Sequence, residues 1–308
     1  MRIIEDEYQV VDRKRHNRYK YRGQATAYLM LLPAFILLSV FVILPLVLAV
    51  VRSFQNYDTK EFVGFDNYIY LFQMDKVFFK TFLNALLLTA ITTIILLVTS
   101  FLFANVLKAM DNKFGRLVKV LIYVPFFISG IIAGIIFNLI FNYGGGLITS
   151  ICVLLDKDPI SFTNDRTLAI ISIVVPTVWL GFGYNTLVMY AGLINIPDDY
   201  YHAANVDGAN GLQKMWYITL PNMRNYTVLL IINMVTGYMQ MMEIPMMMTG
   251  GGPLDSTKTP VLYLFDSFRD PSRPDNVTIA GAIILMILIM AVNITVFKTI
   301  KTRRSEDV

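Results

Sequence analysis

Six apolar runs, each long enough to cross a membrane as a helix, divide the chain. The runs are residues 27–51, 84–107, 118–142, 167–192, 226–248 and 277–300. About 20 consecutive apolar residues span the hydrocarbon core of a bilayer in helical form. Charged side chains fall mainly between the runs rather than within them. This pattern predicts an all-α integral membrane protein with six transmembrane helices.

The composition supports the same class. Hydrophobic residues make up 56% of the 308 residues, whereas a soluble domain has about 45–50% apolar residues. The net charge of +4 comes from basic residues beside the runs, so it indicates no nucleic-acid partner. The single cysteine, Cys152, excludes an internal disulfide, and the two histidines, His16 and His202, lie far apart in the sequence. We therefore expect no metal site and no cofactor in this chain.

The basic residues also predict how the chain crosses the membrane. Seventeen of the 26 Lys and Arg residues lie in the N-terminal segment, between the second and third runs, between the fourth and fifth runs, and at the C-terminal end. Cytoplasmic segments carry such an excess. We expect a multi-pass membrane protein with both termini in the cytoplasm.

The predicted division is a cytoplasmic basic segment over residues 1–26, a transmembrane domain over 27–300 and a cytoplasmic tail over 301–308. The basic segment could bind nucleic acid, but its place before an apolar run favours anionic lipid. The first run is longer than the core of a signal peptide, about 7–15 residues, which predicts a retained signal anchor.

The most polar segment between two runs deep in the chain is residues 197–221, P-D-D-Y-Y-H-A-A-N-V-D-G-A-N-G-L-Q-K-M-W-Y-I-T-L-P. Pro197 suits the first turn of a helix, and Gly208 can take the left-handed conformation that closes one. Asn210 can cap a second helix, and Pro221 stands where the next apolar segment begins. The segment predicts two short helices separated by a glycine turn, with small side chains that let another surface approach the backbone.

This segment carries a resemblance. The pattern A-A-x-x-D-G-A, followed at a fixed distance by I-x-L-P, resembles the EAA loop of binding-protein-dependent ABC importer permeases. The resemblance implies that the loop over residues 195–221 is a cytoplasmic coupling helix that docks in a groove of an ATPase subunit. Its coupling positions here are His202, Ala203, Ala204, Asp207, Gly208 and Ala209. The family usually has glutamate where this chain has His202, which leaves open any contact that depends on that carboxylate.

Further segments resemble the sugar-importing, maltose-type branch of the same family. They include V-P-F-F-I-S-G at 124–130, W-L-G-F-G-Y-N at 179–185 and T-G-G-G-P-L-D-S-T at 249–257. The resemblance covers nearly the whole chain after residue 26. It implies the six-helix form of the type I ABC importer permease fold, in a bacterial plasma (inner) membrane. The implied function is that of a permease subunit that forms half of the translocation pathway for a sugar, in particular an oligosaccharide.

The resemblance also implies a set of partners. These are a second homologous permease, a cytoplasmic ABC ATPase dimer that binds ATP and Mg, and an extracytoplasmic solute-binding protein. The chain itself has no G-x-x-x-x-G-K-[ST] sequence to hold nucleotide phosphates, and no evident set of nucleophile, acid and base. We predict that it is not an enzyme and that the partner ATPase hydrolyses ATP.

Polar residues within the fifth run are candidates for the pathway, because polar groups inside a membrane are costly and are often functional. Asn233, Thr236, Gly237, Gln240 and Glu243 have spacings that place them on one face of a continuous helix.

A sugar requires hydrogen-bonding groups for its hydroxyls and aromatic faces for its ring. The predicted substrate-binding residues are Asn233, Gln240, Glu243, Tyr238, Trp179, Tyr184 and Asn138. Hydrogen bonding between membrane helices is the alternative role for the amides, and it stays open for Asn233 and Asn138.

Other functions remain open at this stage. An ion-coupled secondary transporter would require carboxylates near the middle of the membrane, and Glu243 is the only acidic residue well inside a run, near its end. A membrane scaffold would have no use for the polar face. Within the importer class, the substrate could be another neutral or weakly charged solute; the lack of acids or arginines in the runs fits a neutral one.

Overall fold

The computed structural model describes residues 26–110 and 112–301. The predicted basic segment, apart from residue 26, and residues 302–308 of the tail lie outside the described residues. The chain separates into two compact units, Met1–Gly64 and Phe65–Val308.

The first unit contains one apolar helix followed by a turn. The helix covers Thr26–Ser53 and includes a π-helical segment, η1 (Ser39–Ile43), and α2 (Leu44–Ser53). Beyond it, an isolated antiparallel bridge joins Gln55 and Phe62, and the rings of Phe54 and Phe62 stack with centroids 6.1 Å apart. The predicted first span is therefore a single helix in the described residues.

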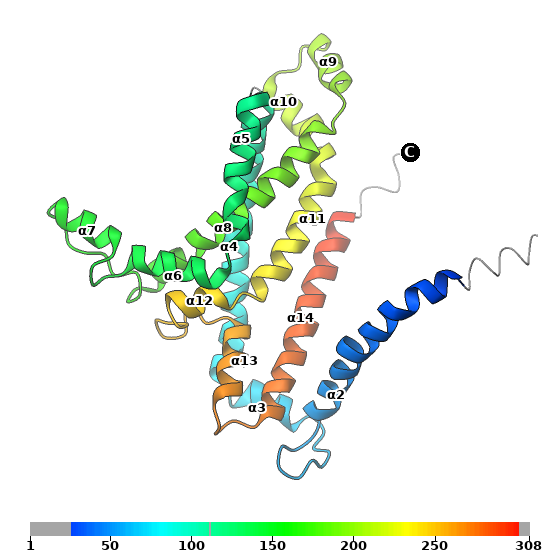
Figure 1. The fold of residues 1–308 in the computed structure, drawn as a ribbon, viewed down its shortest axis with the longest axis vertical. Coiled ribbons are helices and arrows are strands. Elements are labelled where there is room, and N and C mark those ends of the chain that lie inside the picture. Colours follow the sequence, from blue (N-terminus) through cyan, green and yellow to red (C-terminus); the bar gives the residue numbers. More distant parts are fainter. Residues whose placement is uncertain (1–25, 111, 302–308) are drawn as a thin grey trace, which may run out of the picture. The chain divides into compact units, whose positions relative to one another are not determined.

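The second unit is helical throughout its described residues, apart from turns and loops (Figure 1). In chain order its elements are α3 (Asp66–Gln73), α4 (Lys76–Ala109), α5 (Asn112–Tyr123), η2 (Val124–Phe127), α6 (Gly130–Phe141), α7 (Leu147–Leu154), α8 (Arg166–Ile194), α9 (Asp198–Val206), α10 (Gly211–Lys214), η3 (Met215–Thr219), α11 (Leu220–Met239), α12 (Glu243–Met248), α13 (Pro260–Arg269) and α14 (Asp275–Lys301).

Four of the six predicted spans are continuous helices. They are Thr26–Ser53, α4, α8 and α14, and each is long and apolar enough to cross a membrane. The third predicted span is a pair of helices, Lys113–Phe127 and Gly130–Phe141, that meet at 96° and together would make a fifth crossing. The fifth predicted span, residues 226–248, is divided between α11 and α12. The expectation of continuous helices over 118–142 and 226–248 was wrong.

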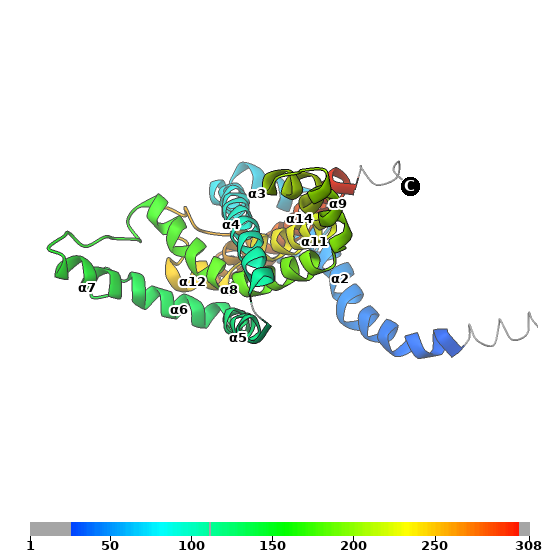
Figure 2. The ribbon, with the colours of Figure 1, turned by 90° about the horizontal axis from the view of Figure 1, so that it is seen from above.

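Proline and an extended backbone segment account for the break in the third span. The α-helix gives way to a 3₁₀ turn, η2, with Pro125 near its start, and Ile128 and Ser129 then have extended backbone conformations. The Ser129 side chain accepts a hydrogen bond from the Ile132 N–H and so caps α6. A new helix therefore begins at Gly130 in a new direction, and α6 and α7 lie to one side of α4, α11 and α14 (Figure 2).

Pro245 explains the break in the fifth span. It has no N–H to donate to the carbonyl oxygen of Met241 four residues earlier, and its ring would crowd that carbonyl in a continuous helix. The Met241 carbonyl instead accepts a hydrogen bond of 2.6 Å from the Thr259 hydroxyl. The helix α11 ends at Met239, and α12 begins at Glu243.

Helix α8 passes close to the backbone of α5. A Cβ atom at Gly183 would overlap the carbonyl oxygen of Ile122 and lie 2.8 Å from the Cα of Tyr123. Only glycine permits this approach, because the neighbouring atoms belong to the backbone and cannot rotate away.

We predict that Gly183→Ala lowers stability by about 1–3 kcal/mol, since overpacking moves the backbone. Thermal unfolding of the purified protein in detergent measures this change. Gly237→Ala is the matched control, because a Cβ there meets no atom within 4 Å. Equal unfolding temperatures for the two variants would contradict the α5–α8 contact.

A partly buried ion pair joins the segment before α4 to the segment before α14, and these segments lie at the end of the second unit opposite α9 and α10 (Figure 1). Arg273 Nη2 lies 2.7 Å from Asp75 Oδ2, and the Asp75 side chain is 6% exposed. Asp75 also caps α4 by accepting from the Val77 and Phe78 N–H groups, and the Tyr263 hydroxyl donates to it. Burial acts to raise the pKa of Asp75, but the bonds from Tyr263 and Phe78 and the charge of Arg273 outweigh it, so this pKa lies below its ordinary value. Burial and the nearby carboxylate raise the pKa of Tyr263 to about 12.

We predict that Asp75→Asn lowers stability at neutral pH by about 1–3 kcal/mol, because it removes the charge but keeps a capping oxygen. Because the pKa of Asp75 is lower in the folded protein than its ordinary value of 3.8, the carboxylate contributes its full stabilisation at any pH above 3.8. That stabilisation is lost as the pH falls through the pKa of the folded protein. The difference from wild type in thermal unfolding should therefore shrink on acidification below that value.

Asp165→Asn is the control for this prediction. Asp165 caps α8 through the Leu168 N–H, and no ion pair involves it among the described residues. A difference for Asp75→Asn that does not depend on pH, or that Asp165→Asn reproduces, would contradict the role of the ion pair.

Candidate functional site

A cavity of about 500 Å³ lies where the two helix breaks meet. The first break contributes Ile128, and the second contributes Gln240, Met241 and Met242. Residues of η2, α6, α8, α11, α12 and α13 complete the lining. Both interruptions of the predicted spans therefore open on the same space.

Three predicted substrate-binding residues line this cavity: Tyr238, Gln240 and Glu243. Gln240 follows the last residue of α11, Glu243 is the first residue of α12, and both are exposed. The Tyr238 hydroxyl lies over Gly181, where a Cβ would come within 2.8 Å of it. A phenol, an amide and a carboxylate beside the apolar side chain of Met241 provide donors and acceptors for hydroxyl groups together with an apolar surface.

The two predicted aromatic residues on α8 lie outside the lining. Tyr184 stacks on Phe126, with centroids 5.1 Å apart, and Phe126 itself lines the cavity. Trp179 packs against Phe137 of α6 at 5.5 Å. Tyr184 thus contacts a residue of the cavity wall without lining the cavity itself, and Trp179 packs α8 against α6.

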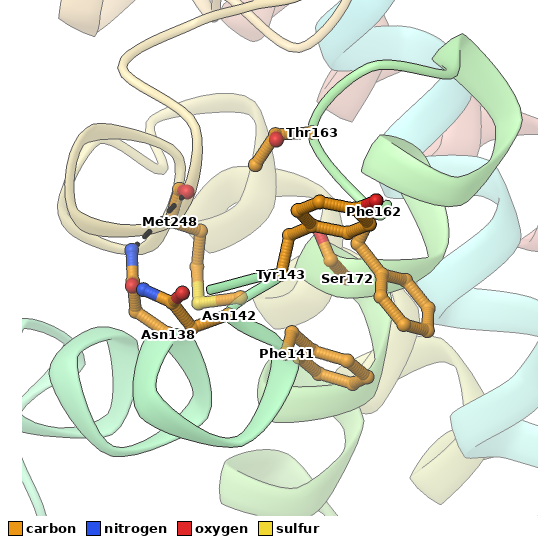
Figure 3. Close-up of a pocket in the computed structure, with 8 residues that line it drawn as sticks. All are labelled: Asn138, Phe141, Asn142, Tyr143, Phe162, Thr163, Ser172 and Met248. Atoms are coloured by element: carbon orange, nitrogen blue, oxygen red, sulfur yellow. Dashed lines mark hydrogen bonds between the residues drawn. The ribbon is translucent and has the colours of Figure 1, made fainter. Parts of the chain in front are cut away.

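Asn138 lies in a second cavity of about 160 Å³ (Figure 3). Its side-chain amide donates to the carbonyl oxygens of Met247 at 2.7 Å and Met248 at 3.3 Å. These bonds tie α6 to α12. Of the two roles left open for Asn138, the geometry favours the bond between helices.

The predicted polar face of the fifth span is divided by the helix break. Asn233 is exposed on α11 and lines neither cavity. Thr236 accepts a hydrogen bond of 2.9 Å from the Asn293 side chain and so joins α11 to α14. The expectation of one continuous face from Asn233 to Glu243 was wrong, because Pro245 prevents the helix that the spacing assumed.

The predicted substrate-binding set leaves out most of the lining, including three residues that shape the cavity. Phe126, Gly130 and Gly181 all line it. The segments at 124–130 and 179–185 contain them, so the signal was present as a resemblance to a family rather than as polar chemistry. Glycine and phenylalanine in an apolar run give no indication that a cavity lies beside them.

The 195–221 loop forms the predicted pair of short helices. The chain leaves α9 through two backbone bonds: the Gly208 N–H donates to the Asn205 oxygen at 3.1 Å, and the Ala209 N–H donates to the Ala204 oxygen at 2.9 Å. This is the bond pattern of a helix closed by a left-handed residue. Gly208 has φ +75°, in the region that favours glycine.

Side chains then fix the second half of the loop. Asn210 and Gln213 exchange hydrogen bonds with each other's backbone N–H groups at 2.9 and 2.8 Å, which caps α10. The Tyr201 and Thr219 hydroxyls lie 2.9 Å apart and join α9 to η3. The loop is therefore a folded unit at the end of α8 and α11 (Figure 1).

Large apolar side chains project from this unit. Val206 is 88% exposed, Leu212 is 67% exposed and Tyr217 is 81% exposed. His202 is exposed on α9 as well. Such a surface suits contact with another protein, while the coupling roles of the predicted residues stay predictions.

We predict that Gly208→Val disrupts this loop, because a β-branched residue is strongly disfavoured at positive φ. Co-purification of an ATPase subunit with the tagged chain should fall at least several-fold. Gly211→Ala is the control, since a Cβ at Gly211 has open space and its φ is not positive. Undiminished co-purification with Gly208→Val would contradict a requirement for the turn.

Metal chemistry finds no support in the described part of the chain. Among those residues, no three His, Cys, Asp or Glu side chains lie close enough together to hold a metal ion. The absence of a metal site in the whole chain stays an expectation.

A comparison with family models matches residues 97–303 to the binding-protein-dependent transport system inner membrane component. The match includes every residue that lines the larger cavity and the whole 195–221 loop.

Individual relatives extend over nearly the whole chain. The sulfoquinovosyl glycerol transport system permease protein of Agrobacterium fabrum is 31% identical over 288 residues, which cover 90% of this chain and 91% of that protein. The trehalose/maltose transport system permease protein of Thermococcus litoralis is 26% identical over 299 residues, which cover 96% and 100%.

A solved structure shares the fold. It is a bacterial alginate ABC transporter in complex with an alginate pentasaccharide-bound periplasmic protein. One of its chains aligns with a TM-score of 0.80 over 94% of this chain and 98% of its own length, at 20% identity.

Proposed function

This chain belongs to the family of binding-protein-dependent transport system inner membrane components, and from that premise we propose that it is the permease subunit of an ATP-driven importer for a sugar, in particular an oligosaccharide. The family inferred from the 195–221 loop is confirmed, as is the all-α membrane fold. The observation that carries the proposal is the larger cavity, in which Tyr238, Gln240 and Glu243 meet beside two helix breaks. In a membrane, irregular backbone is tolerated where it lines a cavity or lies within protein.

The chemistry of this cavity suits polyhydroxyl solutes. The side chains of Gln240 and Glu243 can accept hydrogen bonds, those of Tyr238 and Gln240 can donate them, and Phe126 offers an aromatic surface. Relatives named for the transport of trehalose and maltose and of sulfoquinovosyl glycerol support a sugar as the substrate.

The proposed partners are a second homologous permease, which completes the pathway, and a cytoplasmic ABC ATPase dimer that binds ATP and Mg. An extracytoplasmic solute-binding protein delivers the sugar, and the neighbour solved with a periplasmic protein supports this assignment. The protein resides in the inner membrane with both termini in the cytoplasm, as the distribution of basic residues favours.

The fold offers a mechanical route between the ATPase and the cavity. The 195–221 loop connects α8 directly to α11, through α9, α10 and η3. Along α8, Gly181 in the cavity wall and Ile194 at the helix end are about 20 Å apart at 1.5 Å per residue. The Asn195 side chain donates to the Tyr226 hydroxyl at 2.8 Å and holds the two helices together beside the loop. Movement of the loop against an ATPase would therefore move two walls of the cavity together.

We expect a C-terminally tagged chain, solubilised gently from its native membrane, to co-purify with a second permease and an ATPase that contains a P-loop. Mass spectrometry identifies these proteins, and the accompanying binding protein is then screened against sugars. Purification of the chain alone, or only as a homo-oligomer, would contradict the importer proposal and favour an ion-driven transporter.

A further inference from the structure

The carboxylate of Glu243 occupies space that only a glycine leaves free. At Gly130, the first residue of α6, a Cβ would overlap Glu243 Oε2 and lie 3.0 Å from Glu243 Cβ. Gly134, one turn further along α6, faces Met247 in the same manner, with a Cβ position 2.6 Å from the Met247 Cβ. Because α12 rests on α6 through both glycines, a side chain at position 130 would displace the exposed carboxylate of Glu243 from this place.

The Glu243 carboxylate lies beside the first residue of α6, a helix of 12 residues whose amino-terminal end carries partial positive charge. No hydrogen bond or ion pair of Glu243 occurs among the described residues, in which the ion pairs join Arg273 to Asp75 and Lys258 to Asp255 and Asp266. Glu243 is therefore paired with no oppositely charged side chain among the described residues, and the partial positive charge beside it is that of the α6 terminus.

The rest of the lining carries no compensating charge. Of the residues that line the larger cavity, Glu243 is the only acidic one, and none is Lys, Arg or His. The wall is otherwise made of amide, hydroxyl, aromatic and aliphatic groups. Glu243 is therefore the one formal charge on the lining, and its field acts on solutes that enter the cavity.

We propose that Glu243 makes this cavity electronegative and that the pathway therefore accepts uncharged polyhydroxyl solutes and rejects anionic ones such as uronic acids. Gly130 is the positioning residue that lets the carboxylate face the cavity. The inference rests on the proposed function only in that the cavity forms part of the pathway. According to this proposal, Glu243 determines the selectivity of the cavity for neutral over acidic sugars.

The field can be measured without knowledge of the substrate. Gln240→Cys places a thiol in the same cavity, and its modification rate is compared between a cationic reagent, trimethylammonioethyl methanethiosulfonate, and an anionic one, sulfonatoethyl methanethiosulfonate. The full chain is used in its native membrane. The chain with Gln240 intact gives the background from Cys152, which is buried.

The ratio of the cationic to the anionic rate, divided by the same ratio for a free thiol, should fall about tenfold when Glu243→Gln is added. Gly130→Ala, which keeps the charge but displaces the carboxylate, should lower the ratio in the same direction. Gly237→Ala is the matched control, since Gly237 lines the same cavity and its Cβ position is open. It should leave the ratio unchanged.

An unchanged ratio in Glu243→Gln would overturn the inference, and so would a Gln240→Cys thiol that neither reagent modifies. Since Glu243→Gln nearly preserves shape, this outcome does not depend on whether Gly130→Ala folds.

The labelling experiment requires neither an ATPase nor a binding protein. Its result therefore tests the charge of the cavity independently of the proposed function. If the importer assembles and the ratio is unchanged, only the charge selection is lost. Once the substrate is identified, Glu243→Gln should raise uptake of its uronate analogue relative to the neutral sugar, and equal relative uptake in both chains would again overturn the proposal.

Discussion

Pro245 cannot donate a hydrogen bond to the carbonyl oxygen of Met241, and the region around the larger cavity depends on how that loss is compensated. Inside hydrocarbon an unpaired carbonyl costs several kcal/mol, so the break requires a nearby donor. Thr259, at the start of α13, supplies it. The compensation frees α12 from the axis of α11 and brings it onto α6, where Gly130 and Gly134 leave room for its side chains.

The break in the third predicted span is compensated in the same way, by different groups. Ser129 replaces the missing helical partner of the Ile132 N–H at the start of α6. The Asn138 side chain then bonds to the backbone of α12. Two half-helices thus hold each other, and the unwound backbone before each of them faces the cavity. The structure keeps irregular backbone within protein, which is the condition for such backbone in a membrane.

The length of the apolar runs predicted the class and the places of the long helices, and proline, glycine and asparagine signals predicted the two short helices of the 195–221 loop, because each depends on local chemistry. Length and hydropathy specify α4, α8 and α14, and Gly208 and Asn210 specify the turn and cap between α9 and α10. The site was only partly predictable. Gln240 and Glu243 were found from their polarity and Tyr238 from its aromatic ring, but Gly130 and Gly181 line the cavity by lacking a side chain, which no polarity pattern reveals. The direction of Asn138 and Thr236 depends on the helix breaks and on neighbours far along the chain.

The ion pair between Asp75 and Arg273 also bears on the order in which the protein is made. The two residues are 198 positions apart, so a ribosome that adds about 5–20 residues each second needs about 10–40 s to produce the arginine after the aspartate. During that interval α4 already has its amino-terminal cap, but the carboxylate lacks its cation. Arg273 is synthesised just before α14, the last of the described helices. The ion pair therefore forms among the last events of biosynthesis. A chain truncated before Arg273 retains an uncompensated charge on Asp75, which distinguishes an unfinished chain from a complete one.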